Sequence, residues 1–132
     1  MNPKIKQHFE SLELQFIESP IVTRYEIVRQ EISETDAKFR VKAELLDGGL
    51  LELFEYVTTL SGTLILLKYS FHWQDRQGRL QRRWDNAPHH PDLPGSPHHI
   101  HLDDVTVQGI QTVPKFFDIL QQNIEAIFNK TT

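Results

Sequence analysis

The feature that most constrains the fold of this chain is a succession of alternating apolar and polar residues between positions 21 and 85, broken by short turn sequences. Alternation places neighbouring side chains on opposite faces of an extended strand. The breaks at Asp47-Gly48-Gly49, Ser61-Gly62 and Asp75-Arg76-Gln77-Gly78 contain residues that accept tight hairpin turns. We therefore expect an antiparallel sheet of about five strands built from consecutive hairpins, near residues 21–29, 39–45, 51–57, 63–73 and 79–85. The most apolar of them, residues 63–73, is expected in the middle of the sheet.

Two stretches outside this region have the spacing of amphipathic helices. Residues 3–18 carry apolar side chains three and four positions apart, and Pro20 prevents a longer helix. Residues 113–128 repeat the pattern, with Thr112 as a candidate cap and Pro114 in the first turn. The sequence thus predicts an α+β fold with an N-terminal helix, the antiparallel sheet, a proline- and histidine-rich loop, and a C-terminal helix packed on the sheet.

Composition narrows the classes of protein that fit. With 132 residues and 39% hydrophobic content, the chain is expected to form one domain, residues 1–132. A net charge of -4 excludes a uniformly basic nucleic-acid binder, and the absence of cysteine excludes thiolate chemistry. No apolar run approaches the roughly 20 residues that span a bilayer. We expect a cytoplasmic protein without membrane association.

One segment is basic although the whole chain is acidic. Between Lys68 and Trp84, five lysines and arginines accompany a single acid, Asp75, with aromatic residues interleaved. Cations neutralise phosphates and aromatic faces stack on bases, so this mixture suits single-stranded RNA, with Arg79, Arg82 and Trp84 as the candidate RNA-binding residues. The alternative is an edge hairpin whose arginines face solvent and whose aromatic residues lie in the core.

Histidine is concentrated in the second half of the chain: six of the seven histidines fall between His72 and His101. His99 and His101 are two residues apart, so an extended backbone projects both imidazoles to one side and Ile100 to the other. Such a pair can act as general acid and base in RNA cleavage by the 2′-hydroxyl, with Arg82 or Arg83 stabilising the charged phosphorane.

The histidines also allow two other interpretations. A divalent metal could bind the pair, with further ligands from His89, His90, Asp92, Asp103 or Asp104, although the spacing matches no specific metal signature. Alternatively, the histidines of a proline-stiffened loop are simply solvated. That bland interpretation fits His8, on the first helix, and His72, which alternates with Phe71 and Trp73.

Asp85 and Asn86 lie at the end of the last predicted strand. An acid and an amide at this position commonly turn the chain by bonding their own backbone. Asp85 could also accept the second N–H of an imidazole, which would fix the direction of that ring. We expect both roles.

The segment Trp84-Asp85-Asn86-Ala87-Pro88-His89-His90, followed by Pro97-His98-His99-Ile100-His101, resembles the motif of the TumE family, the toxins of prokaryotic toxin-antitoxin pairs. The close match covers residues 82–104, and the sheet before it and the helix after it agree in kind. The resemblance implies a growth-restraining toxin with a cognate antitoxin, usually one that carries a DNA-binding domain. It marks as shared polar positions Asp85, Asn86, His89, His90, His98, His99 and His101. Compared with the shortest members of that family, this chain has an added opening helix and strand. Whether its first 30 residues belong to the core or contact the antitoxin is therefore open.

The leading hypothesis is therefore a toxin that acts as a metal-independent endoribonuclease, without a cofactor. Its candidate catalytic residues are His90, His99, His101, Arg83, Asp85 and Asn86, with His89 and His98 as secondary candidates. The alternatives are a non-enzymatic module that binds nucleic acid or protein, and a metal-dependent hydrolase. The exposed edge strands of such a sheet also allow a homodimer.

Overall fold

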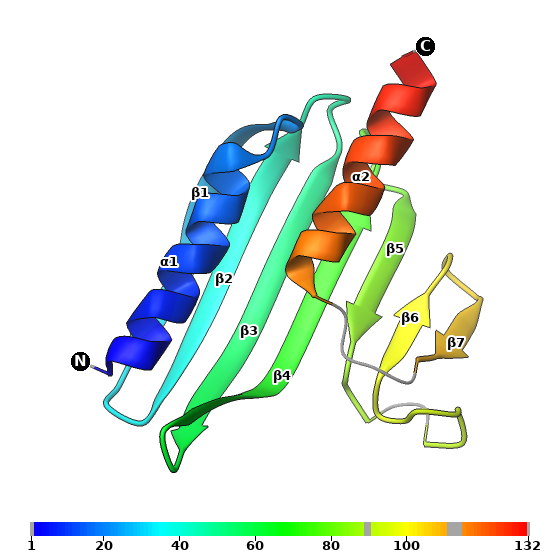
Figure 1. Ribbon diagram of the computed structural model, residues 1–132. Coiled ribbons are helices and arrows are strands. Elements are labelled where there is room, and N and C mark those ends of the chain that lie inside the picture. The colour runs from blue at the N-terminus through cyan, green and yellow to red at the C-terminus, as the bar shows by residue number, and fades with distance from the viewer. Residues whose placement is uncertain (1, 89–90, 111–114, 132) are drawn as a thin grey trace.

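The computed structural model describes residues 2–88, 91–110 and 115–131. Its elements form one seven-stranded sheet with two helices, and every neighbouring pair of strands is antiparallel (Figure 1). In chain order the elements are α1 (Pro3–Glu18), β1 (Val22–Ile32), β2 (Asp36–Leu45), β3 (Leu50–Leu60), β4 (Thr63–Gln74), β5 (Leu80–Asp85), β6 (His99–His101), β7 (Val107–Gly109) and α2 (Phe116–Thr131). The predicted α+β class and antiparallel sheet are confirmed.

The strands follow one another across the sheet in chain order, from β1 at one edge to β7 at the other. The predicted turns connect them: Gly48, Gly62 and Gly78 all have φ near +80°, which favours glycine. The carboxylate of Asp75 accepts hydrogen bonds from the backbone N–H groups of Gln77 and Arg79 and closes the β4–β5 turn. β4 occupies the middle of the sheet, as predicted.

The prediction of about five strands is wrong, because β6 and β7 extend the sheet to seven. These strands contain three residues each, too few to produce an alternating pattern that could be recognised in the sequence. β6 pairs with the edge of β5, and β7 pairs with β6. Between them, the Asp103 carboxylate accepts the N–H groups of Val105 and Thr106 at 2.8 and 2.7 Å and forms the turn.

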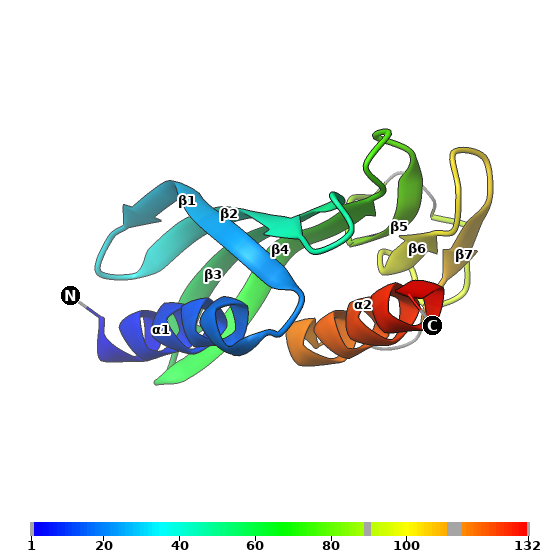
Figure 2. The same ribbon diagram turned by 90° about the horizontal axis from the view of Figure 1, so that it is seen from above.

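Both helices lie against the same face of the sheet, which leaves the other face uncovered by either helix (Figure 2). The Asn2 side chain caps α1 by accepting the N–H groups of Lys4 and Ile5. α2 begins at Phe116, three residues later than the predicted start, and the candidate cap Thr112 lies outside the described residues. Neither described helix is long and apolar enough to cross a membrane.

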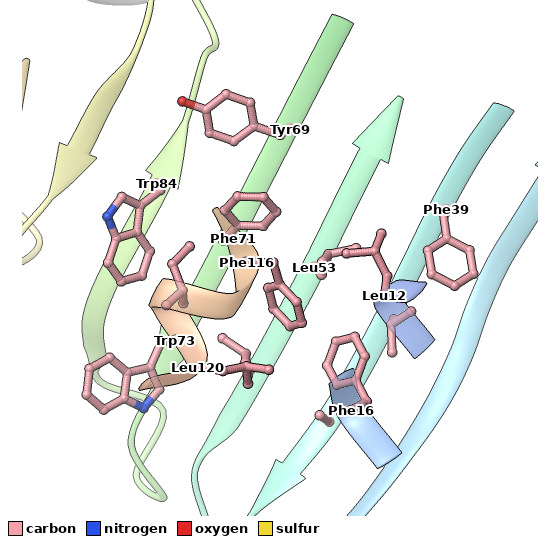
Figure 3. Close-up of a cluster of buried hydrophobic side chains, with 14 of the residues drawn as sticks. Leu12, Phe16, Phe39, Leu53, Tyr69, Phe71, Trp73, Trp84, Phe116 and Leu120 are labelled. Carbon is pink, nitrogen blue, oxygen red and sulfur yellow. The ribbon is translucent and has the colours of Figure 1, made fainter. Parts of the chain in front are cut away.

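The core fills the space between the helices and the sheet (Figure 3). Phe9 of α1 stacks on Phe39 of β2, with ring centroids 4.4 Å apart. The ring centroid of Phe116 in α2 lies 4.8 Å from that of Phe16 in α1 and 5.9 Å from that of Phe71 in β4. Aromatic side chains therefore join both helices to the middle of the sheet.

A polar pair, His8 and Glu55, joins α1 to β3. The Nε2 atom of His8 is 2.7 Å from Oε1 of Glu55, whose side chain projects from β3 toward the helix and is only 4% exposed. Such a carboxylate is costly to bury without a partner. The interpretation of His8 as merely solvated is wrong: it holds α1 over a buried acid.

Candidate functional site

Strand alternation sorts the side chains of β4, β5 and β6 between the two faces of the sheet. Trp84 and Ile100 are paired across β5 and β6, and both contribute to the core on the helix side. Their neighbours Asp85, His99 and His101 consequently project to the open face, the face that neither helix covers.

Asp85 is the centre of this cluster. Its Oδ1 atom lies 2.8 Å from Nε2 of His99 and accepts the backbone N–H of Ala87 at 3.0 Å. The other ring nitrogen of His99, Nδ1, donates to the carbonyl oxygen of Pro97 at 2.9 Å. Both ring nitrogens of His99 thus face oxygen atoms, and the ring is fixed from both sides. The expected role of Asp85 in orienting an imidazole fits this geometry.

The second oxygen of Asp85 faces the groups that reach solvent. Oδ2 accepts Nε of Arg83 at 3.1 Å and lies 3.5 Å from Nε2 of His101. The side chain of His99 is 2% exposed, whereas those of His101 and Arg83 are 21% and 39% exposed. The rings of His99 and His101 meet edge to face, with centroids 4.9 Å apart. A substrate on the open face can therefore touch His101 and Arg83. His99 is buried beneath them and contacts Asp85 and the ring of His101.

His72 belongs to the same face, and its interpretation as merely solvated is wrong. It pairs with Arg83 across β4 and β5, and its Nδ1 accepts Nη1 of Arg83 at 3.3 Å. Its Nε2 lies 2.9 Å from Oε1 of Gln74, to which it donates in this tautomer. His72 therefore helps to fix the direction of Arg83. The signal that could have revealed it is the strand period, which places it opposite Phe71 and Trp73 and beside the site.

Asn86 connects the end of β5 to an irregular part of β4. Its Oδ1 accepts the N–H of Tyr69 at 3.0 Å, and its Nδ2 donates to the carbonyl of Leu67 at 3.1 Å. Leu67 is the residue at which the pairing of β3 with β4 shifts. Asn86 thus joins the end of β5 to β4. The expected turn through bonds to the neighbouring backbone is wrong for Asn86, whose partners are distant in sequence, whereas Asp85 does accept the N–H of Ala87.

The loop that precedes β6, described over residues 91–98 and called the histidine loop below, is anchored at its end by a contact between His98 and Tyr69. The Tyr69 hydroxyl is 3.0 Å from Nδ1 of His98, and the two rings stack. Burial, and then the charge of Asp85, raises the pKa of Tyr69 above its ordinary value of 10.0, which keeps this hydroxyl protonated as a donor. Gly109 of β7 packs so closely against the loop that a Cβ there would lie 1.8 Å from the carbonyl oxygen of Pro94.

The structure alters the expected RNA-binding set. Trp84 is 4% exposed and packs in the core, as do the aromatic residues of β4. The alternative prediction is therefore right that these rings lie in the core, but wrong that the hairpin is at the sheet edge, because β6 pairs with β5 and β7 follows it. Burial removes Trp84 from any surface that could stack on a base. Arg82 also projects to the helix side, where its Nη1 donates to the carbonyl of Leu102 at 2.9 Å. Arg79 is exposed in the β4–β5 turn.

The described residues contain one group with the donor set of a metal site: Asp85, His99 and His101. One ligand atom from each lies within 4.8 Å of the others, and imidazole and carboxylate suit zinc and related ions. The exposed acids considered from sequence, Asp92, Asp103 and Asp104, are not part of this group. Any ion there would compete with Arg83 for the Asp85 carboxylate.

The cluster thus unites four of the six candidate catalytic residues, Arg83, Asp85, His99 and His101, and Asn86 supports it. His90 and the secondary candidate His89 lie outside the described residues. The family model described as Toxin TumE matches residues 12–131. The chain belongs to the TumE toxin family. No curated protein and no solved structure matches it.

Membership of a toxin family implies a cognate antitoxin as partner of this TumE-family protein. The family match begins within α1 and takes in every strand. The first 30 residues, whose place was open from sequence, therefore include family-matched residues. They also contribute Phe16 and Ile21 to the core.

Proposed function

We propose that this TumE-family toxin is an endoribonuclease whose site is the cluster of Asp85, His99, His101 and Arg83 on the open face. The observation that carries the proposal is the convergence of two imidazoles and a guanidinium on one buried carboxylate at the edge of an uncovered sheet face. RNA cleavage by the 2′-hydroxyl requires proton carriers and a cation for the phosphorane, and within this cluster His101 and Arg83 can supply one of each.

The solvent exposures of the four side chains indicate a different role for each. His101 is the proton-transfer group that reaches substrate, and Arg83 is the cation that contacts the phosphate. Asp85 and His99 position these two groups rather than touch RNA, because both are almost completely buried. The sequence suggested His90 as a catalytic residue, and we propose that it supplies the second proton-transfer group; it lies outside the described residues.

In this reaction the 2′-oxygen forms a bond to phosphorus as a base removes its proton, and the bond from phosphorus to the 5′-oxygen breaks as an acid protonates that oxygen. The products carry a 2′,3′-cyclic phosphate on one fragment and a 5′-hydroxyl on the other. Neither water nor a metal ion takes part in this cleavage step.

Expression of the protein with and without the neighbouring antitoxin gene, followed by sequencing of RNA ends, tests the proposal. We expect growth arrest and new 5′-hydroxyl ends only without the antitoxin. Arrest with intact RNA would refute the endoribonuclease proposal and favour a non-enzymatic binding module. In that case, purified protein would bind nucleic acid in a salt-dependent way without releasing product.

A metal-dependent hydrolase is the second candidate, favoured by the close approach of the three ligand atoms of Asp85, His99 and His101. In such an enzyme these three residues would hold the ion, which would supply an activated water for hydrolysis, and the expected ends would be a 3′-hydroxyl and a 5′-phosphate. Cleavage that stops in a chelator and returns with zinc would support this candidate. Cleavage that continues in the chelator supports the metal-independent mechanism.

The antitoxin of this pair is proposed to carry a DNA-binding domain, as the family resemblance suggested. A homodimer through the sheet edges, β1 and β7, also stays a prediction.

A further inference from the structure

The open face of the sheet contains a second feature beside the histidine cluster. A hollow of about 450 Å³ lies over β1 to β5, and five cationic side chains line it. These are Arg29, Lys38, Arg40, Lys68 and Arg83. Among the residues that the structure describes, none of those lining the hollow is acidic, although the chain as a whole has a net charge of -4. The hollow is therefore a local basic site on an acidic protein.

The pairing of the strands places two of these cations, Arg29 and Arg40, on one line across the sheet. Arg29 of β1 pairs with Arg40 of β2, and Arg40 pairs with Phe54 of β3. The same line continues through Ser70 of β4 to Asp85 of β5. At roughly 4.8 Å between neighbouring strands, the line from β1 to β5 is on the order of 19 Å long. It leads across the open face directly to the candidate catalytic cluster.

The arginines of the hollow are held by carboxylates beside it. Arg29 pairs with Glu31, with Nη2 and Oε2 3.0 Å apart, and Arg40 pairs with Glu52. Two arginines directly opposite each other on neighbouring strands repel, which is unfavourable for a sheet. A ligand with several negative charges would relieve that repulsion.

Two cations of the hollow are fixed over aromatic rings. Cζ of Arg40 lies 4.6 Å from the centroid of Phe54, and Nζ of Lys38 lies 5.3 Å from that of Tyr56. The cations cover these ring faces, so the rings do not offer a platform for bases. Their effect is to order the charged groups before a ligand arrives, which favours contact with phosphates rather than with bases.

We propose that this hollow binds the phosphate backbone of single-stranded RNA and guides the strand toward His101 without reading its sequence. The inference rests on the proposed function, which makes RNA the substrate. The position of Arg83 favours RNA over an acidic segment of the antitoxin as the ligand of the hollow, because Arg83 both lines the hollow and pairs with Asp85. A polyanion that fills the hollow therefore ends at the candidate catalytic groups.

The test measures binding apart from cleavage. A fluorescent 2′-O-methyl RNA oligonucleotide lacks the attacking hydroxyl, so its affinity can be followed by anisotropy over a series of salt concentrations. The variant is Lys38→Glu/Lys68→Glu, which changes two cations of the hollow and none of the proposed catalytic groups. The control is Lys6→Glu/Lys115→Glu, with the same change of charge at exposed residues outside the hollow.

For the wild-type chain and the control we expect the same affinity and the same slope of log K against log salt. The hollow variant should bind at least about tenfold more weakly, and its slope should be smaller by about 1.4, which is about 0.7 for each lost phosphate contact. Lys68→Glu alone, at an exposed residue, should reduce the slope by about 0.7. This single variant keeps the test valid if the change at Lys38 disturbs the fold.

Equal RNA affinity of the hollow variant and the control would overturn this inference. The same result with lost affinity for the cognate antitoxin would identify the hollow as an antitoxin surface, which also overturns it. Failure of the proposed function looks different: the wild-type chain would bind the oligonucleotide through the hollow but would not cleave unmodified RNA.

Discussion

The Nε2 atom of His99 lies 2.8 Å from Oδ1 of Asp85, and both side chains are buried at the edge of the open sheet face. Because the opposite nitrogen of His99 donates to the carbonyl of Pro97, the imidazole cannot turn without losing one of these contacts. The pair thereby fixes the position of the Asp85 carboxylate, whose other oxygen faces Arg83 and His101.

Asp85→Asn tests this arrangement. The amide removes the negative charge from a buried site and places N–H donors against groups that are themselves donors. We expect the free energy of unfolding to fall by on the order of 2 to 3 kcal/mol, together with most of the RNA cleavage. Urea denaturation and a cleavage assay measure the two effects. Asp104→Asn, at an exposed residue of the β6–β7 turn, is the control, and equal behaviour of the two variants would contradict this role.

The strand period predicted much of this arrangement. The two-residue spacing around Ile100 placed His99 and His101 on one side, and the turn sequences around Gly48, Gly62 and Gly78 separated the first five strands. Alternation could not say which face the helices cover, and so it left Trp84 as a candidate RNA-binding residue. Which face is covered depends on the packing of α1 and α2, which are distant in sequence from these strands and from each other.

The basic hollow was not predictable for a different reason. Arg29 and Arg40 are more than forty residues from Arg83 in the sequence, and the order and register of the strands bring all three to the lining of one hollow. A search for local charge clusters finds only the β4–β5 hairpin. The short strands β6 and β7 were missed because three residues carry no measurable period.

His8→Ala should destabilise the fold without affecting the site. The change leaves the Glu55 carboxylate buried under α1 without its imidazole partner, which we expect to cost about 1 to 3 kcal/mol in the free energy of unfolding. Thermal or urea denaturation measures the effect, with Lys6→Ala on the exposed side of α1 as control. A His8→Ala variant as stable as Lys6→Ala would show that the pair contributes nothing.

Gly109→Ala should displace the histidine loop. A methyl group at this position would lie 1.8 Å from the Pro94 carbonyl oxygen, a backbone atom, so the loop has to shift as a whole. We expect faster proteolysis or faster amide exchange in residues 91–98 and a loss of cleavage. Gln108→Ala, its exposed neighbour in β7, should behave as the wild-type chain. An unaltered loop in Gly109→Ala would refute the close packing.

The β6–β7 turn should weaken in acid. Backbone N–H groups of Val105 and Thr106 hold the pKa of Asp103 below its ordinary value of 3.8. A folded pKa below the unfolded one stabilises the turn above the unfolded value, and this contribution is lost as pH falls through the folded value. Amide exchange at Thr106, measured by NMR and corrected for intrinsic rates, should therefore show falling protection below the ordinary value. Asp103→Asn should remove that pH dependence, and an unchanged profile would contradict the assignment.

The most direct test of the central claim is the rate at which purified His101→Ala cleaves RNA, compared with the wild-type chain and with His99→Ala. We predict a loss of at least about 100-fold for His101→Ala with little change in stability, because its side chain reaches solvent. His99→Ala should lose both cleavage and stability, since it leaves Asp85 without its buried partner. Cleavage by both variants at the wild-type rate would contradict the assignment of this cluster as the active site.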